Sequence, residues 1–401
     1  MKIKSIRQAK NLAGQTVFLR VDFNVPLKKG KVLDDLRIIQ SIPDIAFLLD
    51  RKCKVIIATH LGRPEGRVKL EYSTKPLASF LGKFLKRPVK FLDITGLKKL
   101  SAVQEIIKKM KPGSLIFLEN LRFNKGEQSN DQKFARGLAS LADVYVNNAF
   151  AVCHRADASV AAIKKYLPSY AGLLLEKEVI NLRKIIKPQK PLVVVVGGEK
   201  MNTKISLLKN LLPPAKYILI GGALANVFLM AKKINIGQSL VDKGSVKLAQ
   251  EILKRGRGKI VLPVDFVTAS SLKNHRTIGP KNLIKIRRYN EVQAREFIGD
   301  IGPETIALFA SYIKQAKTIV WNGPLGLFEV SNFRHGTIII GRTIASVSGD
   351  RAFGVVGGGE TVEAVKMSQM GEYIDWVSTG GGAMLAFLGK EKMPGLQGIV
   401  R

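Results

Sequence analysis

Short apolar runs separated by helix-like segments constrain the fold of this chain more than any other feature. Each half of the sequence contains four of them, at residues 17–21, 55–58, 115–118 and 144–146, and then at 192–196, 218–220, 319–321 and 353–356. Strands that are covered on both faces show such runs, whereas strands with one solvated face alternate apolar and polar residues. Residues 43–52 and 131–142 are amphipathic, and we expect them to form crossover helices. The pattern predicts an α/β fold with parallel sheets.

The length of the chain predicts two domains, because one hydrophobic core rarely organises 401 residues. The best boundary lies between residues 170 and 191, where a helix-like run ends in Lys187-Pro188-Gln189-Lys190-Pro191. Proline cannot continue a helix, and a new apolar run follows at once. We therefore expect an N-terminal domain at residues 1–170, an interdomain helix and linker at 171–191, a C-terminal domain at 192–388 and a terminal segment at 389–401.

The chain is strongly basic. Its 65 Lys and Arg residues outnumber 31 Asp and Glu residues, which leaves a net charge of +34, and the excess extends over both halves. Such a charge attracts polyanions, including nucleic acids, in a salt-dependent way. The alternative is a solvated basic surface without a dedicated partner, because neither an aromatic stacking platform nor a nucleic-acid motif accompanies the charge. Charge alone leaves both interpretations open.

The cysteines and the apolar content indicate the compartment. Cys53 and Cys153 lie far apart in the sequence and lack a metal-binding spacing, so free thiols in a reducing compartment are expected. No apolar run has the length of a membrane span, and no apolar signal core follows the charged N-terminus. These features predict a cytoplasmic protein.

The loops that follow the predicted strands of the first half are rich in side chains that bind anions. Ligands of parallel α/β sheets gather at the carboxyl ends of the strands. The motifs found there are RVDFNVP from Arg20, THLGRP from Thr59, LENLRF from Leu118 and HRAD from His154. Arginine binds phosphate and carboxylate through paired hydrogen bonds. A solvated surface arginine would explain any one of these motifs, but it explains poorly an arginine in nearly every strand-end loop.

Glycines take the corresponding places in the second half. The motifs are GGEK from Gly197, GGA from Gly221, NGP from Asn322, GGGET from Gly357 and GGG from Gly380. Glycine lets backbone N–H groups approach a phosphate, and the N-terminus of a following helix adds positive potential. A tight turn explains a single glycine loop equally well, but five in series favour a nucleotide site. The Walker pattern of P-loop enzymes is absent.

In their order and spacing, these motifs resemble those of the phosphoglycerate kinase family from about residue 17 to residue 395. DDLRI, GGEKMNTKI, DIGPET, WNGPLGLFE and STGGGA extend the resemblance. It implies two Rossmann-like three-layer domains with parallel sheets, joined by a linker helix, and a C-terminal segment that returns to the first domain. It also implies a monomeric, hinge-bending kinase of glycolysis and gluconeogenesis. Such an enzyme moves a phosphoryl group reversibly between 1,3-bisphosphoglycerate and ADP, giving 3-phosphoglycerate and ATP, with Mg²⁺ bound to the nucleotide.

Carried over residue by residue, the resemblance implies one substrate site in each domain. The implied ligands of phosphoglycerate are Asp22, Phe23, Asn24, Arg37, His60, Leu61, Gly62, Arg63, Arg122 and Arg155. The implied ligands of the nucleotide are Lys200, Lys204, Gly222, Asn322, Gly323, Glu329, Gly358, Gly359, Glu360 and Thr361, with Glu360 as the Mg²⁺ ligand. The implied catalytic residues are Arg37, Lys200, Lys204 and Gly381. Phosphoryl transfer depends on positioning and on positive charge at the transferring group, which such a set supplies.

The sequence departs from the family pattern at four positions. Glu199 follows the first glycine pair where alanine is usual, and Glu360 takes the place of an aspartate beside Mg²⁺. Asp157 ends a motif that usually ends in histidine, and Ala223 replaces a third glycine. Mg²⁺ accepts either carboxylate but requires near-octahedral geometry. These changes bear on nucleotide affinity more than on the transfer itself.

Two other functions make different predictions. A non-catalytic polyanion- or nucleic-acid-binding protein on the same scaffold would have lost Arg37, Lys204 or the GGGE loop, because fold does not fix function. A kinase of another small carboxylic acid would carry a changed set of arginines. The sequence shows neither change. The kinase of phosphoglycerate is therefore the leading hypothesis.

Overall fold

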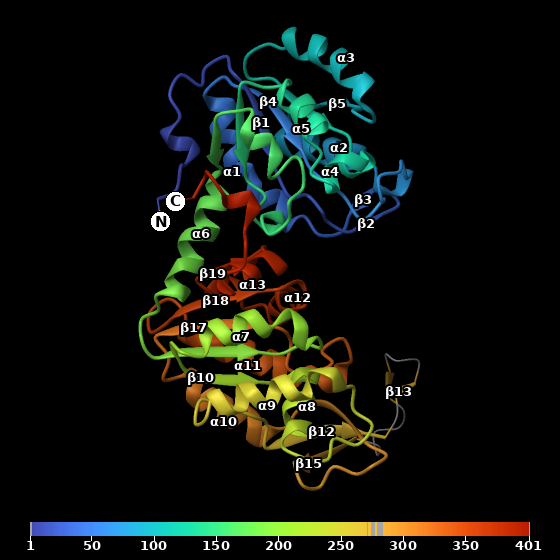
Figure 1. The fold of residues 1–401 in the computed structure, drawn as a ribbon. Coiled ribbons are helices and arrows are strands. Elements are labelled where there is room, and N and C mark those ends of the chain that lie inside the picture. Colours follow the sequence, from blue (N-terminus) through green and yellow to red (C-terminus); the bar gives the residue numbers. More distant parts are fainter. Residues whose placement is uncertain (1, 271, 274–276, 279–283, 401) are drawn as a thin grey trace. The chain divides into compact units, whose positions relative to one another are not determined.

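The computed structural model describes residues 2–270, 272–273, 277–278 and 284–400. The chain forms two compact units (Figure 1), unit 1 with Met1–Val179 and Lys392–Arg401, and unit 2 with Ile180–Glu391. The division falls inside helix α6 (Leu173–Ile186), so that one helix contributes to both units. In the part of the chain that is described, no helix combines the length and the apolar character that crossing a membrane requires.

Unit 1 is built on a six-stranded sheet with the order β5-β6-β4-β1-β7-β8, in which every pair of neighbours is parallel. Its strands are β1 (Thr16–Arg20), β4 (Lys54–Ala58), β5 (Lys90–Leu92), β6 (Leu115–Leu118), β7 (Val144–Asn147) and β8 (Ser169–Ala171). The four strands expected from apolar runs are confirmed. The two edge strands, β5 and β8, were missed because both are short and begin with a polar residue, Lys90 in β5 and Ser169 in β8, so neither forms a continuous apolar run.

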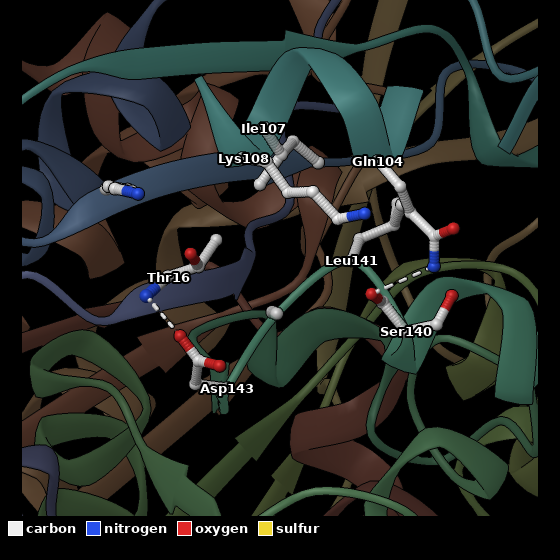
Figure 2. Close-up of a pocket in the computed structure, with 9 residues that line it drawn as sticks. Thr16, Gln104, Ile107, Lys108, Ser140, Leu141 and Asp143 are labelled. Atoms are coloured by element: carbon white, nitrogen blue, oxygen red, sulfur yellow. Dashed lines mark hydrogen bonds between the residues drawn. The ribbon is translucent and has the colours of Figure 1, made fainter. Parts of the chain in front are cut away.

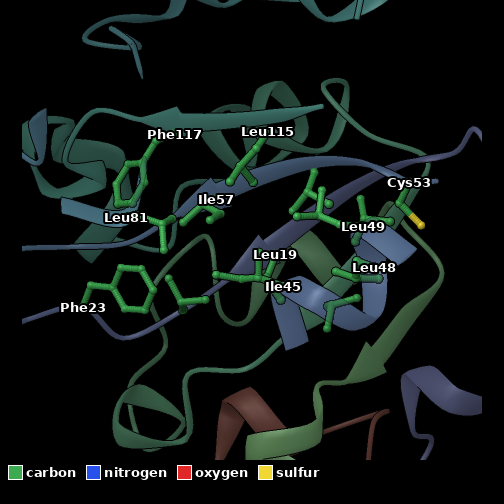
Figure 3. Packing of buried hydrophobic residues seen from close by; sticks show 14 of the residues in the cluster. Leu19, Phe23, Ile45, Leu48, Leu49, Cys53, Ile57, Leu81, Leu115 and Phe117 are labelled. Carbon is green, nitrogen blue, oxygen red and sulfur yellow. The ribbon is translucent and has the colours of Figure 1, made fainter. Parts of the chain in front are cut away.

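Both faces of this sheet are buried, which explains the continuous apolar runs. On one face, Leu19, Ile57 and Phe117 share a core with residues of helices α1 (Leu36–Asp50) and α2 (Lys75–Leu85) (Figure 3). Residues that point to the other face, such as Phe18, Ile56 and Ile116, are equally buried. The remaining helices of the unit are α3 (Leu97–Lys108), α4 (Lys125–Gln128) and α5 (Gln132–Ala139).

The helix expected at residues 43–52 begins seven residues earlier, at Leu36, and Pro43 lies inside it. Proline removes one helical hydrogen bond, but the buried face formed by Ile38, Ile45 and Leu48 continues across it. This correction matters for the site, because the first turn of α1 carries Arg37. The helix expected at residues 131–142 is α5, which Asp131 caps by accepting a hydrogen bond from the Phe134 N–H at 2.6 Å.

The C-terminal segment Lys392–Arg401 belongs to unit 1. The Gly395 N–H donates to the carbonyl of Cys153 at 2.9 Å, and Nζ of Lys164 donates to the carbonyl of Gln397 at 2.8 Å. An antiparallel bridge joins Ile3 to Val400, so the two ends of the chain lie side by side (Figure 1).

Unit 2 is built on a second six-stranded parallel sheet, with the order β11-β10-β9-β17-β18-β19. Its strands are β9 (Leu192–Val196), β10 (Ala215–Ile220), β11 (Ile260–Val261), β17 (Thr318–Asn322), β18 (Phe353–Gly357) and β19 (Trp376–Ser378). Its helices are α7 (Ile205–Leu211), α8 (Gly222–Ala231), α9 (Val246–Arg255), α10 (Pro303–Ile313), α11 (His335–Val347), α12 (Gly359–Ser368) and α13 (Gly382–Leu388). The four strands expected in the second half are confirmed.

Unit 2 also contains an antiparallel sheet that the apolar runs did not predict. It has the order β15-β12-β16, with β12 (Asp265–Ala269), β15 (Ile284–Arg288) and β16 (Phe297–Ile301). Strand β15 alternates apolar and basic residues, so no continuous run marks it. Two short antiparallel ladders pair the other described strands: β2 (Leu27–Lys28) with β3 (Lys31–Val32) in unit 1, and β13 (Leu272–Lys273) with β14 (Thr277–Ile278) in unit 2.

Candidate active site

The predicted ligands of both substrates follow the carboxyl ends of strands in the two parallel sheets. In unit 1 they come after β1, β4, β6 and β7, which are neighbours or next neighbours in the sheet. In unit 2 the glycine loops come after β9, β10, β17, β18 and β19. Because parallel strands end at the same edge, the loops that carry the predicted ligands lie together at the carboxyl edge of each sheet.

Asp22 joins the loop after β1 to helix α1. Nη1 of Arg37 donates to Oδ2 of Asp22 at 2.6 Å and to the carbonyl of Asn24 at 3.3 Å. Oδ1 of Asn24 accepts the N–H of Gly62 at 2.9 Å, which adds the loop after β4. Four of the predicted phosphoglycerate ligands therefore form one connected group.

A cluster of arginines surrounds His60. Its side chain is only 3% exposed. Burial holds the pKa of the imidazole well below its usual value, and the positive charges of Arg20, Arg122, Arg155 and Arg37 lower the pKa further. The imidazole is therefore neutral at physiological pH, and it can offer a single N–H donor. This arrangement can attract an anion without proton transfer from the histidine.

Arg122 is buried with part of its guanidinium unsatisfied. Nη1 donates to the carbonyl of Gly62 at 2.9 Å, but Nε and Nη2 donate no hydrogen bond to the described residues. Burial lowers the pKa of this guanidinium from its usual value, and the charge of Asp157 opposes that shift. Oδ2 of Asp157 lies 3.6 Å from Nη2 of Arg122. The Asp157 departure thus sets a carboxylate against a predicted substrate arginine.

Two predicted ligands of unit 1 have side chains that face the core. The ring of Phe23 is fully buried, with its centroid 6.1 Å from that of Phe117, and its N–H donates to Oγ1 of Thr59. Leu61 is buried, and its N–H and carbonyl both bind the side chain of Asn120. The buried side chains of these two residues anchor the loops that follow β1 and β4. Two arginines remain more accessible: Arg63 is exposed and Arg155 is half-buried, with its Nε donating to Nε2 of His154 at 3.4 Å.

In unit 2, Lys204 is buried at the start of α7. Its Nζ donates to Oδ1 of Asn322, and Nδ2 of Asn322 donates to the carbonyl of Gly357 at 2.5 Å. Burial lowers the pKa of Lys204 to about 8, while the charge of Glu360 opposes the shift. Asn322 is itself buried, so its amide orients Lys204 and the loop after β18.

Backbone hydrogen bonds interlock the glycine loops. The Gly198 N–H donates to the carbonyl of Pro324 at 2.7 Å, and the Gly222 N–H donates to that of Leu325 at 2.9 Å. The Gly323 N–H donates to Oγ1 of Thr361, a buried side chain, at 2.7 Å. Gly323 has a φ of +93°, and a Cβ there would lie 2.3 Å from the carbonyl oxygen of Gly197. Only glycine fits at this position, where the loops of Gly323 and Gly197 pass close to each other.

The remaining predicted nucleotide ligands are more accessible. Lys200, Glu329, Gly359 and Glu360 are exposed. Gly358 is the N-cap of α12, and Gly381 is the N-cap of α13.

Glu360 could hold Mg²⁺ only together with a nucleotide. It lies in the first turn of α12, and its Oε2 is 3.9 Å from the point where a Cβ of Gly198 would lie. The described residues contain no group of three or more His, Cys, Asp or Glu side chains that could hold a metal ion. Mg²⁺ is usually bound by one or two carboxylates together with substrate phosphates. One exposed carboxylate beside the glycine loops fits that requirement.

Arg20 belongs to the RVDFNVP motif, but the sequence analysis did not include it among the predicted ligands. Its signal was a single arginine inside the otherwise apolar run at residues 17–21. In the structure it is completely buried beside His60.

Two cavities of unit 1 lie at the amino ends of its strands, away from the predicted ligands. One of about 400 Å³ lies at the amino ends of β1 and β4, next to the end of α3 (Figure 2). There Asp143 accepts the N–H of Thr16 at 2.8 Å, and Gln104 donates to the carbonyl of Ser140 at 3.1 Å. A second cavity, of about 540 Å³, lies at the amino ends of β5 and β6. The candidate active site consists of the strand-end loops in each unit.

Comparisons with known proteins agree with one another. Residues 6–391 match the phosphoglycerate kinase family. A phosphoglycerate kinase from Pelotomaculum thermopropionicum is 40% identical over 408 residues and covers 100% of both chains, and one from Moorella thermoacetica is 43% identical over 390 residues and covers 96% of both. The solved phosphoglycerate kinase of Coxiella burnetii matches with a TM-score of 0.86 and 37% identity, covering 99% of this chain and 98% of that one. That of Pyrococcus horikoshii matches with a TM-score of 0.84 and 32% identity, covering 98% of each.

Proposed function

The chain belongs to the phosphoglycerate kinase family, and we propose that unit 1 binds phosphoglycerate while unit 2 binds ADP or ATP. The protein is a kinase of glycolysis, which transfers a phosphoryl group reversibly between 1,3-bisphosphoglycerate and ADP. The observation that best supports the assignment of unit 1 is the buried guanidinium of Arg122, whose Nε has no hydrogen-bond acceptor among the described residues and whose Nη2 has only the carboxylate of Asp157, 3.6 Å away. An anionic ligand would supply that acceptor.

Phosphoglycerate has two anionic ends, and the arginine cluster suits both. Arg122 and Arg155 would bind one end together with Arg63. Asp22 would accept the one hydrogen bond that the substrate hydroxyl can donate, and the amide group of Asn24 would donate to the hydroxyl oxygen. Arginine suits this role because it binds phosphate and carboxylate through paired hydrogen bonds and always keeps its charge.

Arg37 and Lys204 would supply positive charge to the phosphoryl group during its transfer. The transferring phosphoryl group carries its charge on three equatorial oxygens, and fixed cations stabilise that charge. Lys200, the N–H groups at Gly358 and Gly381, and the starts of α12 and α13 would contribute from unit 2. The leaving carboxylate needs no proton, so a neutral His60 and the lack of a general base are consistent with the reaction.

Glu360 would hold Mg²⁺ together with the nucleotide phosphates, and the bound ion would supply positive charge to those phosphates. Asn322 and Thr361 would act indirectly. Asn322 would orient Lys204, and Thr361 would hold the backbone at Gly323. Gly222, Gly323 and Gly359 would let the nucleotide approach the backbone, and Glu329 would contact it from the loop after β17.

A coupled assay with ATP, Mg²⁺ and 3-phosphoglycerate tests the proposal. We expect turnover that requires all three, and activity with acetate or glycerate lower by orders of magnitude. Arg122→Lys, which keeps the charge but removes the paired donors, should raise KM for 3-phosphoglycerate. Equal activity with acetate, or an unchanged KM in the variant, would contradict the assignment of the arginine cluster.

We also propose that the enzyme acts as a monomer in the cytoplasm. Both cysteines are free and buried, and burial raises the pKa of Cys53 to about 11 and that of Cys153 to about 12. Such thiols are inert, which suits a reducing compartment. Light scattering of the purified protein would measure the oligomeric state.

Part of the surplus charge supports a second proposal, a salt-dependent surface for nucleic acid at the amino edge of the unit 1 sheet. Residues 83–111 contain nine Lys or Arg against two Asp or Glu, and both acids are already paired, Asp93 with Lys99 and Glu105 with Lys108. Cations also line the two cavities described above. Lys54 and Lys108 line the first, together with Asp143, and the second is lined by Arg87, Lys90, Lys109 and Lys111. A concave basic surface suits a phosphate backbone better than a flat anionic bilayer.

A further inference from the structure

Arg20 lies fully buried at the end of β1, where its guanidinium makes three directed contacts. Nε donates to Oγ of Ser159 at 2.9 Å, and Nη1 donates to the carbonyl of Val21. Nη2 lies 3.2 Å from Nδ1 of His60. Strand β1 is one of the two central strands of the sheet, so this arginine lies on a rigid element.

We propose that Arg20 is a positioning residue that holds His60 in the tautomer with its proton on Nε2. A guanidinium has only donors, so the Nδ1 atom that faces Arg20 must be the acceptor of the hydrogen bond. A neutral imidazole with an acceptor at Nδ1 carries its proton at Nε2. The contact with Arg20 thereby assigns the position of the proton on His60.

Another group in the same site, the carboxylate of Asp22, favours the other tautomer of His60. Oδ1 of Asp22 lies 3.7 Å from Nδ1 of His60, and a carboxylate at this position favours a proton on Nδ1. Arg37 weakens that competition, because its Nη1 holds the other oxygen of Asp22 at 2.6 Å. Without the Arg20 donor, we expect Asp22 to draw the proton to Nδ1. The tautomer is thus decided by the balance between one buried arginine and one paired carboxylate.

The tautomer decides how His60 meets an anionic substrate. With the proton on Nε2, the ring donates a hydrogen bond to a carboxylate or phosphate oxygen. With the proton on Nδ1, Nε2 turns a lone pair towards the same oxygen, which is repulsive. This step rests on the proposed role of His60 as a phosphoglycerate ligand.

The charge of Arg20 is balanced inside unit 1 through Ser159. Oγ of Ser159 accepts from Arg20 and donates to Oε1 of Glu127 at 2.5 Å, and its N–H donates to Oε2 at 3.0 Å. Glu127 is fully buried; burial raises the pKa of its carboxyl, and the charge of Arg20 opposes that shift. Removing Arg20 alone would leave an unpaired buried carboxylate and could unfold the protein. A test therefore removes both charges, in the double variant Arg20→Met with Glu127→Gln.

Nitrogen NMR of histidine-labelled protein without substrate measures the tautomer directly. The sequence has four histidines, so the spectrum of His60→Gln identifies the signals of His60. We expect a neutral ring with an unprotonated Nδ1 and a protonated Nε2 in the wild type, and a gain of protonated Nδ1 in the double variant. Glu127→Gln alone should keep the wild-type pattern. A wild-type ring protonated on Nδ1, or the same tautomer in the double variant, would overturn the proposal.

Kinetics then show whether the tautomer of His60 affects substrate binding. The double variant should raise KM for 3-phosphoglycerate about 10- to 100-fold, with a smaller effect on kcat, because a hydrogen bond to a charged group is lost. In the His60→Gln background, the same two substitutions should change KM far less. Equal effects in both backgrounds would show that Arg20 does not act through His60. If His60→Gln itself leaves KM unchanged while the tautomer result holds, it is the proposed ligand role of His60 that fails.

Discussion

The ammonium group of Lys204 donates a hydrogen bond to Oδ1 of Asn322, whose Nδ2 is bound to the carbonyl of Gly357. The amide of Asn322 therefore cannot turn away from the lysine without breaking its contact to the loop after β18. Lys204 is buried without a carboxylate in salt-bridge contact among the described residues, and its pKa is lowered to about 8 by that burial. A buried lysine with a lowered pKa is prepared to gain its proton when an anion arrives.

The first prediction is that nucleotide binding takes up a proton. At pH 8 about half of the Lys204 side chains are protonated, and the phosphates of a nucleotide raise the pKa of the ammonium by opposite charge. Titration calorimetry in two buffers of different ionisation enthalpy should therefore report an uptake of about half a proton at pH 8. Lys204→Met should abolish this uptake. The same uptake in that variant would assign the proton to another group.

The second prediction concerns Arg37. If it stabilises charge on the transferring phosphoryl group, Arg37→Ala should lower kcat by about 10²- to 10³-fold, the usual effect of removing such a donor, and raise KM much less. Loss of the 2.6 Å contact to Asp22 adds a smaller effect on binding. Arg87→Ala, at the opposite edge of the sheet, is the control and should retain wild-type kinetics. A variant that turns over normally and only binds more weakly would remove Arg37 from catalysis.

The third prediction concerns the pH dependence of stability. Asp44 of α1 is buried and accepts hydrogen bonds from the N–H groups of Leu173 and Leu174 at the start of α6. Burial raises the pKa of its carboxyl to about 6, from 3.8. The folded protein therefore binds more protons at Asp44 than the unfolded chain does between these values, and the stability from this group is lost as pH rises through about 6.

Urea unfolding of the wild type and of Asp44→Asn at pH 5 and pH 7 measures this effect. The unfolding free energy of the wild type relative to the variant should fall by about 1 kcal/mol between the two pH values. Other buried carboxyls, such as Asp300, with its pKa raised to about 8 by burial, are common to both proteins and cancel in the comparison. A relative stability that rises with pH would contradict the prediction.

The fourth prediction tests the basic surface at the amino edge of unit 1. Binding of a fluorescent oligonucleotide should weaken steeply between 50 and 200 mM salt, roughly in proportion to the number of phosphate contacts. Changing Lys86, Arg87, Lys90 and Lys111 to glutamine should reduce the slope of log K against log salt by up to about 3–4, at about 0.9 per contact. The matched control changes four exposed lysines of unit 2: Lys232, Lys233, Lys247 and Lys254.

Equal losses in the two sets would show that the charge acts as a diffuse field over the whole protein. Binding to anionic lipid vesicles without binding to the oligonucleotide would replace nucleic acid by a membrane surface as the partner. A binding affinity that does not change with salt concentration would contradict the electrostatic basis of the proposal.

The fifth prediction is closure during the reaction. The proposed ligands of phosphoglycerate all belong to unit 1, and those of the nucleotide all belong to unit 2. Transfer requires reacting atoms about 3–3.5 Å apart, so both sets must meet around one phosphoryl group. Small-angle scattering should give the smallest radius of gyration with both substrates and Mg²⁺ present, compared with either ligand alone. An active enzyme whose ternary complex is no more compact than the free protein would rule this out.

The sequence by itself determined the central strands and the location of the candidate ligands. Runs such as Leu192–Val196 are apolar at every position because helices cover both faces of the strand, and this local pattern survives in any single sequence. The motifs after those runs could be assigned to one edge of each sheet because parallel strands end together. The apolar signal was weak for three-residue edge strands such as β5, and for β15, where basic residues alternate with isoleucine.

Only the tertiary structure decided which side chains meet. Helix α1 starts before Pro43 because its buried face continues across the proline, and this start gives Arg37 its contact with Asp22. The contact of Arg20 with His60 joins residues 40 positions apart, and the network to Glu127 spans more than 100 positions. Local sequence patterns report the burial and periodicity of a segment. They do not report the distances between segments, on which hydrogen-bond partners, pKa shifts and the tautomer of a buried histidine depend.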